Sequence, residues 1–187
     1  MNIPNIISLS RILLTPVFAL LYVNGRSTQA LAVLLICAAS DVLDGAIARR
    51  FNMVTDLGKA LDPAADKLIQ LTMLLCAATR FRAVWLLLAL HILRELSLGA
   101  AGLYVLRQTG RVYGARWYGK LCTAVLYIVM TVFLFLRSVP DSAVRAGTAM
   151  CAFLISLCLS LYMANYIRIL RLCREHEAEK DPRSGLK

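Results

Sequence analysis

Long apolar stretches separated by short polar breaks constrain this chain more than any other feature of its sequence. A transmembrane helix requires ~20 consecutive, mostly apolar residues, and we expect six such segments here. They run approximately over Ile6–Val23, Thr28–Arg49, Leu61–Ala78, Ala83–Leu106, Tyr118–Leu136 and Ala143–Ile169. Hydrophobic residues make up 59% of the 187 positions, and so small a chain cannot bury that much apolar surface in one core. The sequence therefore predicts an all-α integral membrane protein, a six-transmembrane-helix bundle.

Turn-forming and charged residues mark the breaks between these segments. The breaks are Asn24–Gly25, Arg49–Lys59, Arg80–Arg82, Gln108–Gly114 and Val139–Asp141. The first apolar run contains Arg11 and follows no basic region, so we interpret it as a retained helix and not as a signal peptide. After Arg171 the apolar pattern ends and charged residues dominate. We therefore expect one transmembrane domain over residues 1–172 and a charged cytoplasmic tail over residues 173–187.

The net charge of +10 comes from Lys and Arg residues that lie between the apolar segments and in the tail. This distribution fits the positive-inside rule and anionic lipid headgroups, and it argues against nucleic-acid binding, which uses a basic face. Most of these cations fall in the second loop, the fourth loop and the tail. We therefore expect a multi-pass protein of the cell (cytoplasmic) membrane, with both termini on the cytoplasmic side. The six cysteines form no C-x-x-C pair, so neither a zinc site nor a disulfide framework is indicated.

Aspartates concentrate in one short part of the chain, where five of the 11 acidic residues lie between positions 41 and 66. Asp41 and Asp44 are three residues apart near the end of the second segment, and Asp62 and Asp66 are four apart at the start of the third. Helical spacing places each pair on one face, so four carboxylates can meet in one cleft and bind Mg²⁺ or Mn²⁺. We expect this cleft at the cytoplasmic face. The alternative is a set of interfacial ion pairs with the neighbouring cations Arg49, Arg50, Lys59 and Lys67.

Small and turn-forming residues accompany these aspartates. Gly45 leaves space beside the carboxylates, and Ala48 shares the helix face of Asp44 because it lies four residues further on. We expect Gly58 to let the chain turn into the third helix. Pro63 fits an early helical position, where its missing N–H costs little. Asp56 is expected to be a solvated or capping residue of the loop.

Together these positions match a complete signature, D-x2-D-G-x2-A-R-x8-G-x3-D-x3-D, from Asp41 to Asp66. The chain thereby resembles the CDP-alcohol phosphatidyltransferase family, which it also resembles in size and in its pattern of six apolar segments. The resemblance implies transfer of a phosphatidyl group from CDP-diacylglycerol to an alcohol, with release of CMP. It also implies a homodimer in the lipid bilayer.

The resemblance further implies a role for each matched residue. Metal ions, Mg²⁺ or Mn²⁺, would be bound by Asp41, Asp44 and Asp62. Asp66 corresponds to the general base and to a ligand of a second metal ion. Binding of the CDP part of the substrate would fall to Gly45, Ala48, Arg49, Gly58 and Asn5.

The acceptor is indicated by the opening Asn2-Ile3-Pro4-Asn5 with Ser8 and Arg11, which resembles bacterial phosphatidylglycerophosphate synthases. The resemblance extends to Arg94-Glu95 and to Gly119-Lys120 followed by Thr123. It implies sn-glycerol 3-phosphate as the phosphorylated acceptor. Four cations are candidates to bind the acceptor phosphate: Arg94, Arg111, Arg116 and Lys120.

Two departures leave another acceptor open. Gly102 stands where these synthases usually carry a second arginine, and Cys122 stands where they usually carry a second lysine. The alternative acceptor is phosphatidylglycerol, as in cardiolipin synthesis. Arg94-Glu95 can also be read as a buried ion pair that serves packing, and Arg107, Arg111 and Arg116 as positive-inside residues. A transporter is a further alternative, but the sequence has no paired halves and its aspartates cluster at one membrane face.

Overall fold

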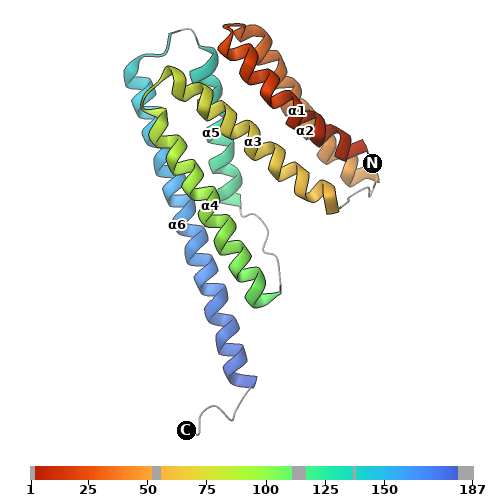
Figure 1. Cartoon of the computed structure of the whole chain (residues 1–187). Coiled ribbons are helices and arrows are strands. Elements are labelled where there is room, and N and C mark those ends of the chain that lie inside the picture. The colour runs from red at the N-terminus through yellow and green to blue at the C-terminus, as the bar shows by residue number, and fades with distance from the viewer. Residues whose placement is uncertain (1–2, 52–55, 111–116, 137, 181–187) are drawn as a thin grey trace. The chain divides into compact units, whose positions relative to one another are not determined.

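The computed structural model describes the backbone of residues 3–51, 56–110, 117–136 and 138–180, and the side chains of residues 9–40, 63–110, 117–136 and 138–172. Over the described backbone the chain is helical apart from short turns, and it contains no strand. The helices labelled in Figure 1 are α1 (Ile3–Val23), α2 (Ser27–Phe51), α3 (Asp56–Arg80), α4 (Val84–Thr109), α5 (Trp117–Phe135) and α6 (Asp141–Lys180). Each overlaps one predicted segment, so the all-α fold class is confirmed.

Within the part of the chain whose side chains the structure describes, three helices are long and apolar enough to cross a membrane, namely α4, α5 and the Asp141–Leu172 part of α6. The described parts of α1 and α2 add shorter apolar stretches, Leu9–Val23 and Ser27–Ser40. Large apolar side chains such as Leu13, Leu20 and Phe153 are largely exposed, which suits a surface in contact with lipid and not one in water. The integral membrane class is confirmed, whereas six membrane crossings remain a prediction.

Two glycines follow helices in the left-handed backbone conformation. Gly25 follows α1 with a φ of 72°, and Gly110 follows α4 with a φ of 65°. The Gly110 N–H donates to the Leu106 carbonyl at 2.8 Å, so it satisfies one of the last carbonyls of α4. Both glycines lie in predicted breaks. Glycine suits these positions because it has no β-carbon, which would make the left-handed conformation unfavourable.

Two helices extend beyond the predicted apolar segments. α3 begins at Asp56 and not at Leu61, so Gly58 and Pro63 lie inside the helix and the expectation of a turn and an early helical proline was wrong. α6 continues to Lys180, into the region predicted as a tail. The physical reason is the same in both cases: hydropathy marks where a chain can enter lipid, whereas a helix can continue into the polar region. Inside α3, Pro63 has no N–H to donate to the carbonyl four residues earlier.

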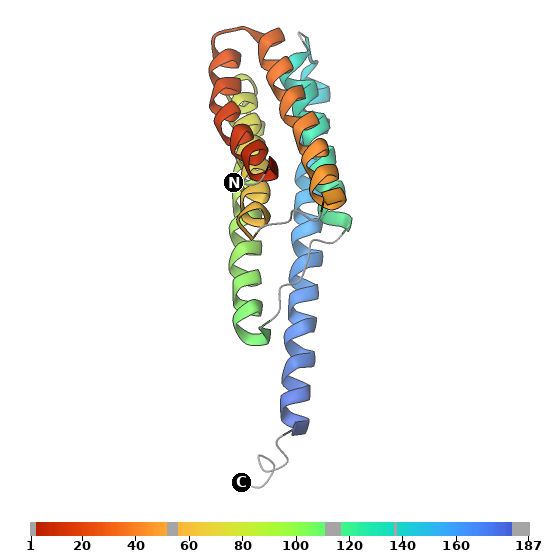
Figure 2. The ribbon, with the colours of Figure 1, turned by 90° about the vertical axis from the view of Figure 1, so that its right-hand side faces the viewer.

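The chain divides into two compact units, of which the first comprises Met1–Leu88 and Tyr127–Val144. In this unit α1 packs against both α2 and α3. The turn after α1 returns the chain so that α1 and α2 run antiparallel (Figures 1 and 2). The best-buried side chains of the unit, at most 1% exposed, include Phe18, Ala30, Met73, Leu74 and Met130.

Arg80, the last residue of α3, connects this helix to the end of α5 within the first unit. Its Nη1 donates to the carbonyls of Phe133 at 3.1 Å and Leu136 at 3.0 Å. Its guanidinium carbon lies 5.0 Å from the centroid of the Phe81 ring. The last carbonyls of a helix have no partner inside the helix, so this arginine caps the C-terminus of α5.

The second unit comprises Ala89–Leu126 and Arg145–Lys187. In it α6 continues past the C-terminal end of α4 (Figures 1 and 2). Buried residues of α6 recur every three or four positions, at Thr148, Cys151, Ile155, Cys158 and Tyr162. Exposed apolar side chains lie between them, at Phe153, Leu157 and Leu161. The described part of α6 thus has one packed face and one face suited to lipid.

A glycine on α5 allows a close approach of α6 in the second unit. Tyr118 and Tyr162 stack edge to face with ring centroids 4.8 Å apart. A β-carbon at the neighbouring Gly119 would lie 2.6 Å from Tyr162 Oη and 3.2 Å from Tyr162 Cε2. Small residues permit such approaches between membrane helices, so Gly119 sets how closely this part of α5 packs against Tyr162.

We predict that Gly119→Ala destabilises the protein by about 1–3 kcal/mol, because the added methyl group overpacks the contact with Tyr162. Thermal unfolding in detergent measures the effect. Gly99→Ala on α4 is the matched control, because no atom lies within 4 Å of a β-carbon there. Gly119→Ala combined with Tyr162→Phe should regain part of the loss, since the nearest atom is removed. Equal unfolding temperatures for the two alanine variants would contradict the prediction.

Candidate functional site

The four aspartates of the signature all lie on helices: Asp41 and Asp44 within α2, and Asp62 and Asp66 within α3. The helical spacing expected of each pair is therefore present in the backbone. The side chains of Asp41, Asp44 and Asp62 lie outside the described residues, so their predicted metal contacts are untested. No three His, Cys, Asp or Glu side chains gather at one place among the side chains that the structure does describe.

Asp66 on α3 forms an ion pair with Arg11 on α1. Arg11 Nη1 donates to Asp66 Oδ1 at 2.9 Å. The two side chains differ sharply in exposure, because that of Arg11 is 4% exposed and that of Asp66 is 49% exposed. A buried cation thus holds a carboxylate that remains accessible from outside the helix packing.

A side-chain hydrogen bond within α1 binds the main-chain carbonyl of Arg11. Thr15 Oγ1 donates to the Arg11 carbonyl at 2.8 Å, and this bond is buried. The next residue, Pro16, lies inside α1 and has no N–H for the carbonyl of Ile12. The bonded carbonyl, that of Arg11, thus directly precedes the Ile12 carbonyl, which lacks its usual helical N–H partner.

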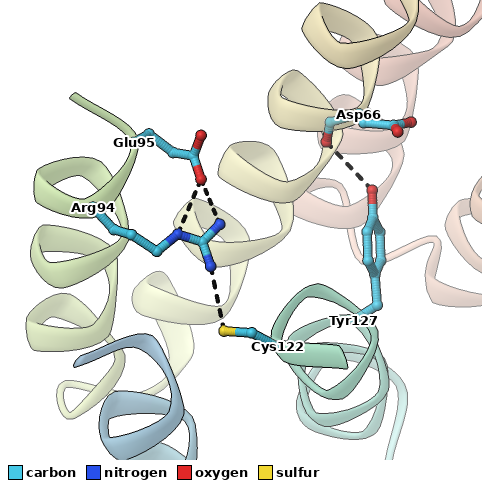
Figure 3. A network of polar contacts seen from close by, with 5 residues as sticks. All are labelled: Asp66, Arg94, Glu95, Cys122 and Tyr127. Atoms are coloured by element: carbon cyan, nitrogen blue, oxygen red, sulfur yellow. Dashed lines mark hydrogen bonds and ion pairs between the residues drawn. The ribbon is translucent and has the colours of Figure 1, made fainter. Parts of the chain in front are cut away.

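Tyr127 on α5 reaches the main chain at Asp66. Its hydroxyl donates to the Asp66 carbonyl oxygen at 3.3 Å (Figure 3). Arg11 and Tyr127 therefore approach Asp66 from two different helices, one at the carboxylate and one at the backbone. All three residues belong to the first unit.

An apolar groove of about 580 Å³ runs along α1 and α3 in the same unit. Its lining includes Ile12 and Leu68 near the start of the groove and Val23 and Thr79 near its end. On α3, Thr79 lies eleven positions after Leu68, which corresponds to ~16 Å along a helix axis. The groove begins one residue after Arg11 and two residues after Asp66, so it starts beside the ion pair.

Arg94 is buried in a separate polar network in the second unit. Its Nε donates to Glu95 Oε1 at 3.0 Å, and its Nη2 contacts the same oxygen. Its Nη1 donates to Cys122 Sγ on α5 at 3.3 Å (Figure 3). The structure therefore brings together Arg94 with Cys122, one of the two departures from the synthase pattern.

The other predicted acceptor residues are only partly described. Lys120 is exposed near the start of α5, whereas Arg111 and Arg116 lie outside the described residues. At Gly102, the second departure, a β-carbon would lie 3.4 Å from Tyr166 Oη. The tyrosine hydroxyl thus lies on the side of α4 where a longer side chain at position 102 would begin.

The residues predicted to contact CDP lie on the described backbone, but their side chains fall outside the described residues. Asn5 is on α1, Gly45, Ala48 and Arg49 are on α2, and Gly58 is on α3. Their roles remain predictions. No contact of these residues is described.

Sequence reasoning assigned no role at Asp66 to Arg11 or Tyr127. A signal for Arg11 was present, because a lone arginine inside an apolar segment is costly unless it has a partner or a function. The sequence could not say which acid it meets, since Arg11 and Asp66 are 55 residues apart. Tyr127 gives no such signal, because a tyrosine in a membrane segment is ordinary.

Comparisons with known proteins bear on these residues. The family model described as CDP-alcohol phosphatidyltransferase matches residues 1–171. A protein of Rickettsia typhi named CDP-diacylglycerol–glycerol-3-phosphate 3-phosphatidyltransferase is 46% identical over 71 residues, 36% of this chain and 40% of the relative. A protein of Pseudomonas fluorescens with the same name is 41% identical over 105 residues, 54% of each chain.

A longer match is found with a protein of Mycobacterium tuberculosis named "probable phosphatidylglycerophosphate synthase". It is 30% identical over 174 residues, 89% of this chain and 82% of the relative. With the Rickettsia and Pseudomonas relatives, in contrast, the chain covers only about half of their length, 40% and 54%.

We predict that Arg94→Met destabilises the protein by about 3–5 kcal/mol, because it leaves the carboxylate of Glu95 without its cation. The double variant Arg94→Met/Glu95→Leu should recover most of that loss. Unfolding in detergent measures stability, and turnover of the refolded double variant separates the two interpretations of Arg94. Full turnover would leave the ion pair a packing feature, whereas stable but inactive protein would favour a role in acceptor binding. A stable Arg94→Met single variant would contradict the prediction.

Proposed function

The chain belongs to the CDP-alcohol phosphatidyltransferase family, and we propose that it transfers the phosphatidyl group of CDP-diacylglycerol to sn-glycerol 3-phosphate, yielding phosphatidylglycerophosphate and CMP. The observation that carries the proposal is Asp66, the fourth aspartate of the family signature, whose accessible carboxylate is held by a buried arginine. The names of the relatives support the choice of both substrates.

The donor set of the signature fits a divalent metal ion. The residues that would hold Mg²⁺ or Mn²⁺ are Asp41, Asp44, Asp62 and Asp66, all of them carboxylates at helical spacing on α2 and α3. Hard oxygen ligands of this kind are the ones these cations prefer. When bound, the metal supplies positive charge that polarises the pyrophosphate and offsets the charge of the departing CMP.

Asp66 is the general base of the proposed reaction. Its carboxylate takes the proton of the acceptor hydroxyl as the hydroxyl oxygen attacks the β-phosphorus of CDP-diacylglycerol. A new phosphorus–oxygen bond forms while the bond between the β-phosphorus and the bridging oxygen breaks, and CMP leaves with that oxygen. The proton remains on Asp66 until solvent removes it. No covalent intermediate on the protein is required, as in other phosphoryl transfers.

The groove along α1 and α3 provides a place for an acyl chain of CDP-diacylglycerol. Its lining is almost entirely apolar, and it begins beside the Arg11–Asp66 pair. An acyl chain in this groove would leave the pyrophosphate at the end where the aspartates lie. The nucleotide would then contact Gly45, Ala48, Arg49, Gly58 and Asn5, where small side chains leave room for cytidine and Arg49 offers a charge to phosphate.

The acceptor phosphate requires cations, and Arg94, Arg111, Arg116 and Lys120 are the candidates in this chain. One observation favours a second acceptor, phosphatidylglycerol, which would give cardiolipin. Arg94 is already bonded to Glu95 and to Cys122, and at position 102 the chain has glycine beside Tyr166 in place of a second arginine. Both features reduce the positive charge available to a dianionic phosphate.

The remaining parts of the proposal concern place and assembly. The concentration of Lys and Arg in the second loop, the fourth loop and the tail supports an active site at the cytoplasmic face of the cell membrane. We also propose a homodimer, which the resemblance to the family implies, and the oligomeric state in detergent or nanodiscs tests it.

The proposed function is tested with purified protein, CDP-diacylglycerol and Mn²⁺, with labelled glycerol 3-phosphate in one tube and unlabelled phosphatidylglycerol in another. We predict phosphatidylglycerophosphate and CMP in the first tube, and no product there after EDTA until Mn²⁺ or Mg²⁺ is restored in excess. Thin-layer chromatography measures both products. Cardiolipin in the second tube alone would assign the alternative acceptor. Absence of CMP release in both tubes would refute the transferase and favour a transporter or structural protein.

We predict that Asp66→Asn lowers turnover by ~10²–10⁴-fold, the range that general base catalysis usually contributes. The substitution keeps the size of the side chain but removes its ability to accept the hydroxyl proton. CMP release per folded molecule measures the effect, with the unfolding temperature as a check that the fold is retained. Wild-type turnover in this variant would exclude Asp66 as the base.

A further inference from the structure

Arg11 is a buried cation within the apolar part of α1. Its side chain is 4% exposed, and the surrounding described stretch, Leu9–Val23, is an apolar helix. A charge in such surroundings is costly and needs a partner of opposite sign. The structure supplies this partner from another helix, Asp66 on α3.

Arg11 and Asp66 differ in solvent exposure, and a role in packing alone does not require this difference. Loss of a partner is costly for a charge that is buried, whereas water can solvate a charge that is exposed. Here the carboxylate of Asp66 is 49% exposed, so water could solvate it without any help from Arg11. The accessible member is also the residue that the proposed reaction needs in one orientation.

One bond holds this carboxylate, and two further bonds restrain the backbones that carry the pair. Arg11 Nη1 binds its Oδ1 at 2.9 Å, and a guanidinium is a planar, rigid donor. Tyr127 Oη binds the Asp66 carbonyl at 3.3 Å, which restrains the backbone from α5. Thr15 Oγ1 binds the Arg11 carbonyl at 2.8 Å, which restrains the backbone under the arginine. An exposed aspartate without these bonds would sample several rotamers.

We propose that Arg11 is a positioning residue for the reaction. Its guanidinium holds the carboxylate of Asp66 in the orientation in which the carboxylate accepts the proton of the acceptor hydroxyl. This inference rests on the proposed function of Asp66 as the general base. Arg11 acts through Asp66 and does not itself touch substrate. Orientation of this kind has a large effect on rate, because a misplacement of about 1 Å can cost ~10²-fold in turnover.

The chain offers a matched control in Arg80. It lies in the same unit and its Nη1 also bonds to another helix, but its acceptors are the carbonyls of Phe133 and Leu136 at the end of α5. Loss of Arg80 should therefore lower stability without changing turnover per folded molecule. Loss of Arg11 should change turnover itself.

The experiment compares full-length wild type with Arg11→Met, Arg11→Lys, Arg80→Met, Asp66→Asn and the double variant Arg11→Met/Asp66→Asn. CMP release per folded molecule gives kcat and KM for both substrates, with the folded fraction measured by size exclusion in detergent. We expect Arg11→Met to lower kcat by ~100-fold with KM for CDP-diacylglycerol within about twofold. Arg11→Lys should regain at least about tenfold in kcat, since an ammonium restores a cation near Asp66.

The double variant decides whether Arg11 acts through Asp66. If it does, Arg11→Met should cause no further loss of kcat in the Asp66→Asn background, because residues that act as a unit are not additive. Additive losses, or wild-type kcat in Arg11→Met, would overturn the inference while leaving the proposed function intact. An inactive wild type would instead refute the proposed function. If Arg11→Met does not fold, Arg11→Gln takes its place in both the single and the double variant, because it also removes the cation. Wild-type kcat in Arg11→Gln, or additive losses with Asp66→Asn, would equally overturn the inference.

Discussion

The ion pair between Arg11 and Asp66 is the interaction on which the arrangement of the first unit depends. A guanidinium inside an apolar helix cannot remain without an anion. α1 must therefore lie against α3 in the register that brings position 11 to position 66. The same register places the groove between the two helices so that it begins beside the pair. One electrostatic requirement thus sets both the helix packing and the place where an apolar substrate chain would meet an acid.

The second unit solves the problem of a buried arginine differently. Arg94 is satisfied by Glu95, its neighbour in sequence, and by the thiol of Cys122 on α5. A pair between consecutive residues places little constraint on how helices align, because it moves as one body with its helix. In this unit close packing sets the fit instead, through Gly119 against Tyr162 and through the buried face of α6. Each unit therefore contains a buried arginine, but an ion pair between helices aligns the first unit and close side-chain packing aligns the second.

The structure shows a neighbour for each of the two departures from the synthase pattern. Cys122 replaces a cation but accepts a bond from Arg94, and Gly102 leaves space that Tyr166 approaches with its hydroxyl. Each departure thus has a described neighbour, Arg94 at Cys122 and Tyr166 at Gly102. The consequence for the acceptor is a reduced positive charge near α4, which is why the choice between glycerol 3-phosphate and phosphatidylglycerol is an experimental one.

The sequence by itself determined the class of fold, the approximate helices and the family, because each depends on local properties. Apolar stretches of membrane length predict helices one at a time, and the aspartate signature needs only correct spacing along the chain. Helix ends were less predictable: α3 starts at Asp56 and includes Pro63, because polar residues flanking a membrane segment can continue its helix. The side chains of Asp41, Asp44 and Asp62 lie outside the described residues, so their convergence stays a prediction. Only the tertiary structure decided that Arg11 meets Asp66 and that Tyr127 reaches the same residue. Partners 55 and 61 residues away are chosen by helix packing, and no local pattern in a single sequence encodes that choice.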